Sequence, residues 1–406
     1  MTIRRKFVLL LSCMLMLATY GAQAQENEMQ PLANDNTAFA FDLFQAITTE
    51  NVNNIIFSPY SISQALAMVY SGANGTTADQ MRDVLNFSLP QEDIPAAFGA
   101  LNSDITEREA VPNTDGQRLE INIANALWGQ IGFPFLTGYV DNLSVNYGAG
   151  LQFADFINAP EPAREEINAW VEDQTEDRIQ NIVPAGAITP QTRLVLANAI
   201  YFNASWMNAF SERGTQDADF TLLNGDAVTV PMMSLSERFL YGEGDGYQAL
   251  SLPYLGNDMG MVVLLPTDGE FETFQRDLTA ERFTEIMQTM GGQQVMVNMP
   301  RFEYEYDLQL SSILASMGMS DAFSDNADFS GMAEDSLSID EVIHKAFIAV
   351  DENGTEAAAA TVITMRATSA PTEIFEFRAD SPFIYAIYDQ LTGSVLFLGR
   401  VMNPLG

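Results

Sequence analysis

The side chains best suited to chemistry are few in this sequence of 406 residues. It contains one histidine, His344, and one cysteine, Cys13. A catalytic nucleophile needs a neighbouring base, and a transition-metal site needs several nitrogen or sulfur ligands. No HExxH, GxSxG or GxxxxGKS/T pattern occurs in the sequence. We therefore expect a protein that is not an enzyme and that holds neither a metal nor a cofactor.

His344 lies in a strand-like run, Glu341–Phe347, where Val342, His344 and Ala346 share one face. A histidine between two apolar neighbours is usually a buried residue whose ring nitrogens are hydrogen-bonded. The alternative is a catalytic base. No serine in a nucleophile-elbow pattern accompanies it, so the pattern favours the buried histidine.

The first 24 residues resemble a targeting segment. Arg4, Arg5 and Lys6 precede the apolar run 7–18, and Ala22-Gln23-Ala24 forms a small-x-small cleavage pattern. This predicts a secretory signal peptide over 1–24 and an extracellular or periplasmic protein. A lipid anchor on Cys13 is the alternative. Cleavage would remove that cysteine, so we expect no disulfide in the exported chain.

The charge is strongly negative, with 54 acidic and 18 basic residues and a formal net charge of −36. Nucleic acid and anionic membrane surfaces would repel such a chain. Beyond the leader, no segment reaches the roughly 20 apolar residues of a membrane span. The acidity favours solubility, in salty water for example, or else a single cationic partner.

The elements predicted from periodicity suggest an α+β fold. Residues 25–35 are polar and predict a flexible segment, and a single domain follows over 36–406. Apolar spacing predicts helices over 37–44, 61–71 and 161–183. Apolar or alternating runs predict strands over 194–202, 259–265, 294–299, 383–388 and 395–402. Helices dominate the first half and strands the second, which argues against regular βαβ winding.

One stretch fits neither a helix nor a strand easily. Residues 354–361 read GTEAAAAT, between the strand-like runs 347–350 and 361–364, and no proline occurs from Val350 to Ala370. Alanine favours helices, but an exposed helix of alanines would bury nothing.

This stretch resembles the hinge of a serpin reactive-centre loop, and further blocks resemble the same family in family order. They are Phe57–Met68, Ile167–Val171, Leu194–Phe202 with Trp206 and Phe210, Leu252–Tyr254, Asp321–Phe323, Ala327–Ser330, Ser381–Phe383 and Phe397–Pro404. Together they span nearly the whole mature chain. The resemblance implies the serpin fold: a large mixed main sheet, two smaller sheets, about eight or nine helices and an exposed loop over about 352–375.

The resemblance also implies a mechanism. A serpin is a suicide inhibitor: a serine protease cuts the loop, the cut loop inserts as a strand into the main sheet, and the acyl-enzyme is trapped. We expect a monomer that forms a covalent 1:1 complex with its target. The alternative is a non-inhibitory serpin, a carrier or chaperone-like protein, whose loop is only a protease substrate.

The site residues carried over by position fall into four groups. The hinge would comprise Glu352, Gly354, Thr355, Glu356, Ala357, Ala358, Ala359, Ala360 and Thr361. A hydrogen-bonded cluster under the sheet, the shutter, would comprise Ser58, Ser61, Asn198 and His344. The upper region, the breach, would comprise Trp206, Arg301 and Glu352.

The fourth group is the scissile bond. Family spacing from Glu352 places it between Thr368 and Ser369, which implies an elastase-like or subtilisin-like target. A register shorter by two places it between Arg366 and Ala367, which implies a trypsin-like target.

Overall fold

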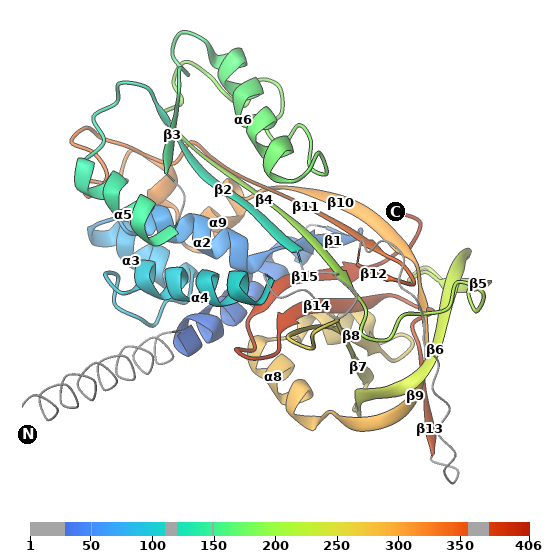
Figure 1. The fold of residues 1–406 in the computed structure, drawn as a ribbon. Coiled ribbons are helices and arrows are strands. Elements are labelled where there is room, and N and C mark those ends of the chain that lie inside the picture. Colours follow the sequence, from blue (N-terminus) through green and yellow to red (C-terminus); the bar gives the residue numbers. More distant parts are fainter. Residues whose placement is uncertain (1–28, 50, 110–119, 148–149, 356–372) are drawn as a thin grey trace, which may run out of the picture.

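The computed structural model describes residues 29–49, 51–109, 120–147, 150–355 and 373–406 (Figure 1). Two sheets and a set of helices make up this part of the chain, so the predicted α+β class is confirmed. Most helices gather on one side of the six-stranded sheet, and α6 crosses its other side (Figure 1).

The six-stranded sheet is mixed and runs in the order β10, β11, β12, β4, β2, β3. Its strands are β10 (Phe302–Gln309), β11 (Glu341–Val350), β12 (Gly354–Thr355), β4 (Leu194–Ser205), β2 (Glu120–Gln130) and β3 (Leu151–Ala154). The predicted strand over 194–202 is the almost fully buried β4, as its nearly continuous apolar run indicates.

The other sheet joins nine strands within the described residues. They are β1 (Ile55–Phe57), β5 (Gln216–Thr221), β6 (Ala227–Gly244), β7 (Tyr247–Pro253), β8 (Met259–Pro266), β9 (Gly291–Pro300), β13 (Ile374–Arg378), β14 (Phe383–Asp389) and β15 (Val395–Val401). The long strand β6 pairs with β5, β9 and β7 along its length. The two smaller sheets implied by the resemblance are therefore continuous here through β6.

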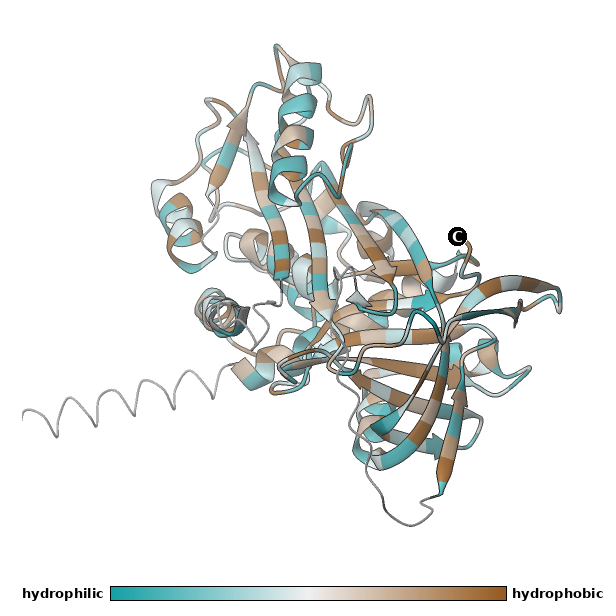
Figure 2. Cartoon of the chain, turned by 45° about the vertical axis from the view of Figure 1, so that its right-hand side comes forward, coloured by the Kyte–Doolittle hydropathy of each residue, from teal (hydrophilic) through white to brown (hydrophobic). Residues whose placement is uncertain are grey.

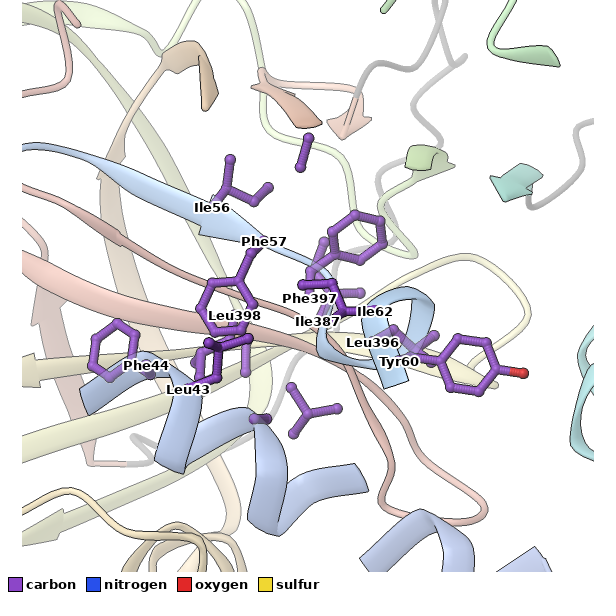
Figure 3. Packing of buried hydrophobic residues seen from close by; sticks show 14 of the residues in the cluster. Leu43, Phe44, Ile56, Phe57, Tyr60, Ile62, Ile387, Leu396, Phe397 and Leu398 are labelled. Carbon is purple, nitrogen blue, oxygen red and sulfur yellow. The ribbon is translucent and has the colours of Figure 1, made fainter. Parts of the chain in front are cut away.

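The core lies between the two sheets and the helices beneath them. Helix α2 (Pro59–Tyr70) is buried along its whole length and contacts β2, β4 and β15. Figure 3 shows apolar side chains from the helix over 29–49, from β1 and α2, and from β14 and β15 meeting in this core. The other helical elements are α3 (Gly75–Val84), α4 (Ile94–Glu109), α5 (Thr137–Tyr147), α7 (Phe271–Arg276), α8 (Ala280–Thr289), α9 (Ser311–Met317) and the short 3-10 turn η1 (Asp321–Phe323).

Helix α6 (Pro160–Gln174) is shorter than the helix predicted over 161–183. It buries Ile167 and Val171 against β2 and β4, and its outer surface is largely hydrophilic (Figure 2). Helical geometry ends because Glu176 and Asp177 adopt positive φ angles of 51° and 62°. Residues 175–183 continue as an irregular segment that still buries Ile179.

The first described helix differs from the predicted flexible segment over 25–35. It covers 29–49, so its first turns fall in the stretch expected to be loose. Within that stretch, Leu32 is fully buried, and the Asp35 carboxylate accepts from the Ser88 backbone N–H at 2.8 Å. Both contacts join residues far apart in the sequence, so the polar composition of 25–35 did not indicate them.

Candidate functional site

The centre of the six-stranded sheet is partly open at one end. Strands β11 and β4 pair directly in parallel from Glu341 with Val195 to Ala346 with Ile200. Beyond this point they separate and β12 lies between them. There Thr355 pairs with Val350 on one side and with Ala204 on the other. Gly354 and Thr355, near the start of the predicted loop, thus already occupy a strand position inside the sheet.

A tight turn delivers the chain into this position. The Asp351 carboxylate accepts hydrogen bonds from the backbone N–H of Asn353 at 2.7 Å and of Gly354 at 3.2 Å. A Cβ on Gly354 would lie 2.1 Å from the Ala204 carbonyl oxygen, so no larger residue fits there. The φ angle of Gly354 is not positive, so the close approach to β4, and not a left-handed backbone, requires a glycine here.

Thr355 is anchored by an aromatic pair. Its side chain is buried, and its hydroxyl lies 2.7 Å from the hydroxyl of Tyr254, which is buried as well. The Tyr254 ring stacks on Trp206, with ring centroids 4.6 Å apart and planes 8° apart. Trp206 holds the turn itself, because its backbone N–H donates to the Asn353 carbonyl at 2.8 Å and its indole N–H to the Asp351 carbonyl at 3.0 Å.

An ion pair fixes the start of the turn. The Glu352 carboxylate is buried and lies 2.5 Å from the Arg301 guanidinium, whose side chain is 44% exposed. The Thr215 hydroxyl donates to the same carboxylate. Burial alone would raise the pKa of Glu352, but the hydrogen bonds from Arg301 and Thr215 outweigh it and hold the pKa below its ordinary value. We call these residues, Trp206, Thr215, Tyr254, Arg301, Glu352, Gly354 and Thr355, the hinge site.

A second polar group lies where β11 and β4 still pair. The Ser58 backbone N–H donates to Nε2 of His344 at 3.1 Å, so Nδ1 carries the ring proton and donates to the Asn198 side-chain oxygen. The Asn198 amide donates to the Ser61 hydroxyl at 2.7 Å. Ser58 itself accepts from the Ser61 backbone N–H at 3.1 Å and caps α2.

His344 is inaccessible and neutral in this setting. Burial lowers the pKa of His344 to about 3, which the hydrogen bond with Asn198 opposes only in part. Both ring nitrogens are engaged, so the ring has no free nitrogen with which to activate a nucleophile. This geometry agrees with the buried histidine that the alternating strand pattern favours.

Asn125 of β2 also belongs to the hydrogen-bonded group around His344, although the sequence analysis did not predict it. Its side-chain oxygen accepts from the Ser61 hydroxyl at 2.9 Å and from the Asn198 amide. Its own amide donates to the Gln64 side-chain oxygen at 2.7 Å. We call Ser58, Ser61, Gln64, Asn125, Asn198 and His344 the histidine network. It connects three strands, β11, β4 and β2, to the helix beneath them.

The predicted site residues thus form two groups along β4. Trp206, Arg301, Glu352, Gly354 and Thr355 meet at its end, and Ser58, Ser61, Asn198 and His344 meet near its beginning. Tyr254 and Thr215 join the first group without having been predicted. The remaining hinge calls, Glu356 to Thr361, and the bait calls, Arg366, Ala367, Thr368 and Ser369, lie outside the described residues.

The residues that the structure describes lack the features of a metal site and of a membrane-spanning helix. In that part of the chain, no three His, Cys, Asp or Glu side chains are arranged to hold a metal ion. None of its helices combines the length and the apolar character that crossing a membrane requires.

The comparison with known proteins identifies the family. The family model described as serpin (serine protease inhibitor) matches residues 34–404, so the chain belongs to the serpin family. It is 41% identical over 384 residues to an uncharacterized serpin-like protein of Thermococcus kodakarensis, covering 94% of this chain and 87% of that one. It is also 40% identical over 388 residues to a leukocyte elastase inhibitor of Sus scrofa, covering 93% and 100%.

Solved serpin structures share the fold. Maspin superposes with a TM-score of 0.84 at 28% identity, covering 93% of this chain and all of that one. Human thyroxine-binding globulin in complex with thyroxine gives 0.83 at 30% identity, with the same coverages. The serpin fold expected from the sequence blocks is therefore confirmed.

Proposed function

We propose that this protein is a secreted suicide inhibitor of serine proteases. The observation that carries the proposal is β12, which already occupies the space between β11 and β4. A loop cut further along could continue from Thr355 as a full strand and displace the parallel pairing of these two strands.

The side chains support such an insertion. Thr355 faces the buried side of the sheet, where it meets Tyr254. Alternate residues of a strand share a face, so Ala357, Ala359 and Thr361 would follow Thr355 toward the core. All are small and uncharged, and Glu356 would fall on the other face. No bulky or charged group therefore opposes entry.

Insertion also supplies the driving force. About a dozen new backbone hydrogen bonds at a net ~1 kcal/mol each give on the order of 10 kcal/mol. This is comparable with the stability of an entire domain. The uncleaved protein would be metastable, and we expect loop cleavage to raise its melting temperature.

Denaturing electrophoresis after incubation with elastase, subtilisin and trypsin tests the proposal. An inhibitor gives a band of summed mass that survives denaturation, because the acyl-enzyme ester is covalent. Thr355→Arg should abolish that band and leave only cleaved protein, because insertion would bury a guanidinium. Thr229→Arg, the same change on an exposed position of β6, should retain it. A summed-mass band that persists in Thr355→Arg would refute insertion.

The covalent complex also allows the class of the target protease to be identified. Mass spectrometry of the peptide released on complex formation distinguishes cleavage after Thr368 from cleavage after Arg366. Cleavage after Thr368 supports an elastase-like or subtilisin-like target, as does the similarity to a leukocyte elastase inhibitor. Secretion is tested by N-terminal sequencing of the exported protein, which should begin at Gln25.

A non-inhibitory serpin is the second candidate. It is favoured by the similarity to thyroxine-binding globulin, whose structure contains thyroxine. The small hinge side chains favour inhibition instead. Cleaved protein without any summed-mass band, for all three proteases, would support the non-inhibitory function.

A further inference from the structure

Three asparagines in the sequence are followed by a glycine: Asn74, Asn224 and Asn353. Asparagine is a thermally labile residue. The backbone nitrogen of the next residue can attack its side-chain carbonyl carbon, and a glycine permits this attack most readily because it has no Cβ to shield that nitrogen. The pair Asn353-Gly354 lies in the turn that delivers the hinge into the sheet. A covalent change there would act directly on the hinge site.

The fold itself keeps this pair reactive. A Cβ on Gly354 would lie 2.1 Å from the carbonyl oxygen of Ala204 on β4, so the sheet requires a glycine at this position. The residue after Asn353 therefore cannot carry a side chain that would shield its nitrogen. Docking of the hinge and lability of the asparagine thus depend on the same glycine.

The docked hinge holds the reacting peptide unit at both of its polar groups. The Asn353 carbonyl accepts from the Trp206 backbone N–H at 2.8 Å, and the Gly354 N–H donates to the Asp351 carboxylate at 3.2 Å. Attack requires the Gly354 nitrogen to lose its proton and to turn toward the Asn353 side chain. The first hydrogen bond resists that rotation, and the negative carboxylate disfavours loss of the proton. The docked turn therefore protects Asn353, and undocking exposes it.

We propose that Asn353 is a self-modification site that becomes reactive when the hinge undocks. The Gly354 nitrogen forms a bond to Cγ of Asn353, the bond from Cγ to the amide nitrogen breaks, and ammonia leaves with the proton from Gly354. Water then opens the cyclic imide at either of its carbonyl groups. The products are aspartate, or isoaspartate with one additional methylene in the backbone. Water is the only co-reactant.

The isoaspartate product does not fit the docked geometry. The turn is closed by the Asp351 backbone N–H, which donates to the Gly354 carbonyl at 3.0 Å. Directly after the turn, Thr355 pairs with Ala204 on β4 and also pairs with β11. An additional backbone atom ahead of Gly354 moves both residues out of this register. The lengthened chain should therefore remain undocked.

The aspartate product keeps the backbone length but adds a carboxylate to the turn. The new charge would lie beside Asp351 and the buried Glu352, and like charges at such short range disfavour one another. This product should dock in the same register but less stably. Modification would limit the lifetime of the inhibitory form, because the loop could still be cut but would not insert. This consequence rests on the proposed inhibitory function.

The reaction is measured by ageing the uncleaved protein without a protease. Native protein and protein unfolded in guanidinium chloride would be incubated in parallel at mildly alkaline pH. Peptide mass spectrometry and isoaspartyl methyltransferase labelling follow the conversion. Asn224 is the internal control, because it is exposed in the turn between β5 and β6. We expect Asn224 to convert in the native protein at nearly its unfolded rate, and Asn353 at least about tenfold more slowly than its unfolded rate.

Tyr254→Phe tests whether undocking controls the reaction. The change removes the hydroxyl that lies 2.7 Å from that of Thr355 and leaves the Asn-Gly pair intact. Loss of this buried hydrogen bond should accelerate conversion of Asn353 about 5- to 30-fold. Conversion of Asn224 should stay unchanged. Tyr388→Phe, which removes a buried hydroxyl from the other sheet, should accelerate neither reaction.

Asn353→Gln tests the consequence for docking. Glutamine keeps the amide but must close a larger ring, which slows its reaction. After ageing, the Trp206 amide of wild type should lose hydrogen-exchange protection in proportion to the isoaspartate formed, whereas Asn353→Gln should retain it. If Asn353→Gln does not dock, the proportionality within aged wild type provides the same readout. The yield of the summed-mass band should fall in the same proportion in aged wild type.

Three results would overturn the inference. They are conversion of Asn353 at its unfolded rate in the native protein, equal conversion in wild type and Tyr254→Phe, and aged protein rich in isoaspartate that retains protection of Trp206. Conversion and docking are both measured without a protease. A missing summed-mass band in unaged protein would therefore count against the inhibitory function and leave the modification site standing.

Discussion

The hydrogen bond between Tyr254 and Thr355 allows a direct test of the docked hinge. Both residues are buried and their hydroxyls lie 2.7 Å apart. Tyr254→Phe removes one hydroxyl without changing the shape of the ring that stacks on Trp206. A lost hydrogen bond and an unpaired buried hydroxyl together cost about 1–2 kcal/mol. Undocking of the hinge should then become about 5- to 30-fold more frequent, since 1.36 kcal/mol is a factor of ten.

Native-state hydrogen exchange measures this opening. The amide to follow is that of Trp206, which donates to the Asn353 carbonyl at 2.8 Å and is released when the hinge undocks. Thr355→Val should accelerate its exchange similarly. The double variant should be faster than wild type by much less than the product of the two single effects, because neither hydroxyl is then left unpaired.

Tyr388→Phe provides the matched control. Tyr388 is also buried and its hydroxyl lies 3.0 Å from that of Ser251, in the other sheet. This change should leave Trp206 exchange unaltered. Equal exchange in wild type and Tyr254→Phe, or strictly multiplicative effects of the two hinge changes, would refute the docked hinge in the uncleaved protein.

Three further changes have defined outcomes. Burial lowers the pKa of His344 to about 3 from its ordinary 6.5, so wild type should lose stability relative to His344→Gln as the pH falls below 6.5. In urea titrations this loss should amount to about 2 kcal/mol at pH 5. A stability difference between the two proteins that is equal at pH 7 and pH 5 would contradict this. Arg301→Ala strips the cation from buried Glu352 and should cost about 1 kcal/mol, a modest value because the guanidinium is half exposed, whereas Arg301→Lys should retain most of the stability in the same titration. Gly354→Val should abolish the hydrogen-exchange protection of the hinge, because the new Cβ would lie 2.1 Å from the Ala204 carbonyl oxygen. Retained protection would show that β4 moves to accommodate the side chain, and would contradict this requirement for glycine.

Local patterns in the sequence predicted the elements that depend on neighbouring residues. The apolar run of β4 and the alternation around His344 are local signals. The residues of β4 and the face of β11 that carries His344 are buried, as these signals predict. The end of α6 was predicted nine residues too late, because the apolar spacing continues through Ile179 while the backbone turns at Glu176. Periodicity records which side chains are buried but not the backbone path between them.

The contacts that complete the two sites join residues far apart in the sequence. Tyr254 lies 101 positions from Thr355, and Asn125 lies 73 positions from Asn198. A tyrosine after a proline and an asparagine among apolar strand residues have ordinary surroundings in the chain. Only strand pairing places their polar atoms opposite a partner. The family blocks supplied positions for Ser58, Asn198 and Arg301 but assigned no role to Tyr254 or Asn125.

A crystal structure of the loop-cleaved protein tests the central claim most directly. We predict that β12 continues beyond Thr355 as a full strand between β11 and β4. The six parallel pairs from Glu341 with Val195 to Ala346 with Ile200 would then be gone. A cleaved molecule in which those pairs remain, and in which the cut segment lies outside the sheet, would contradict the account.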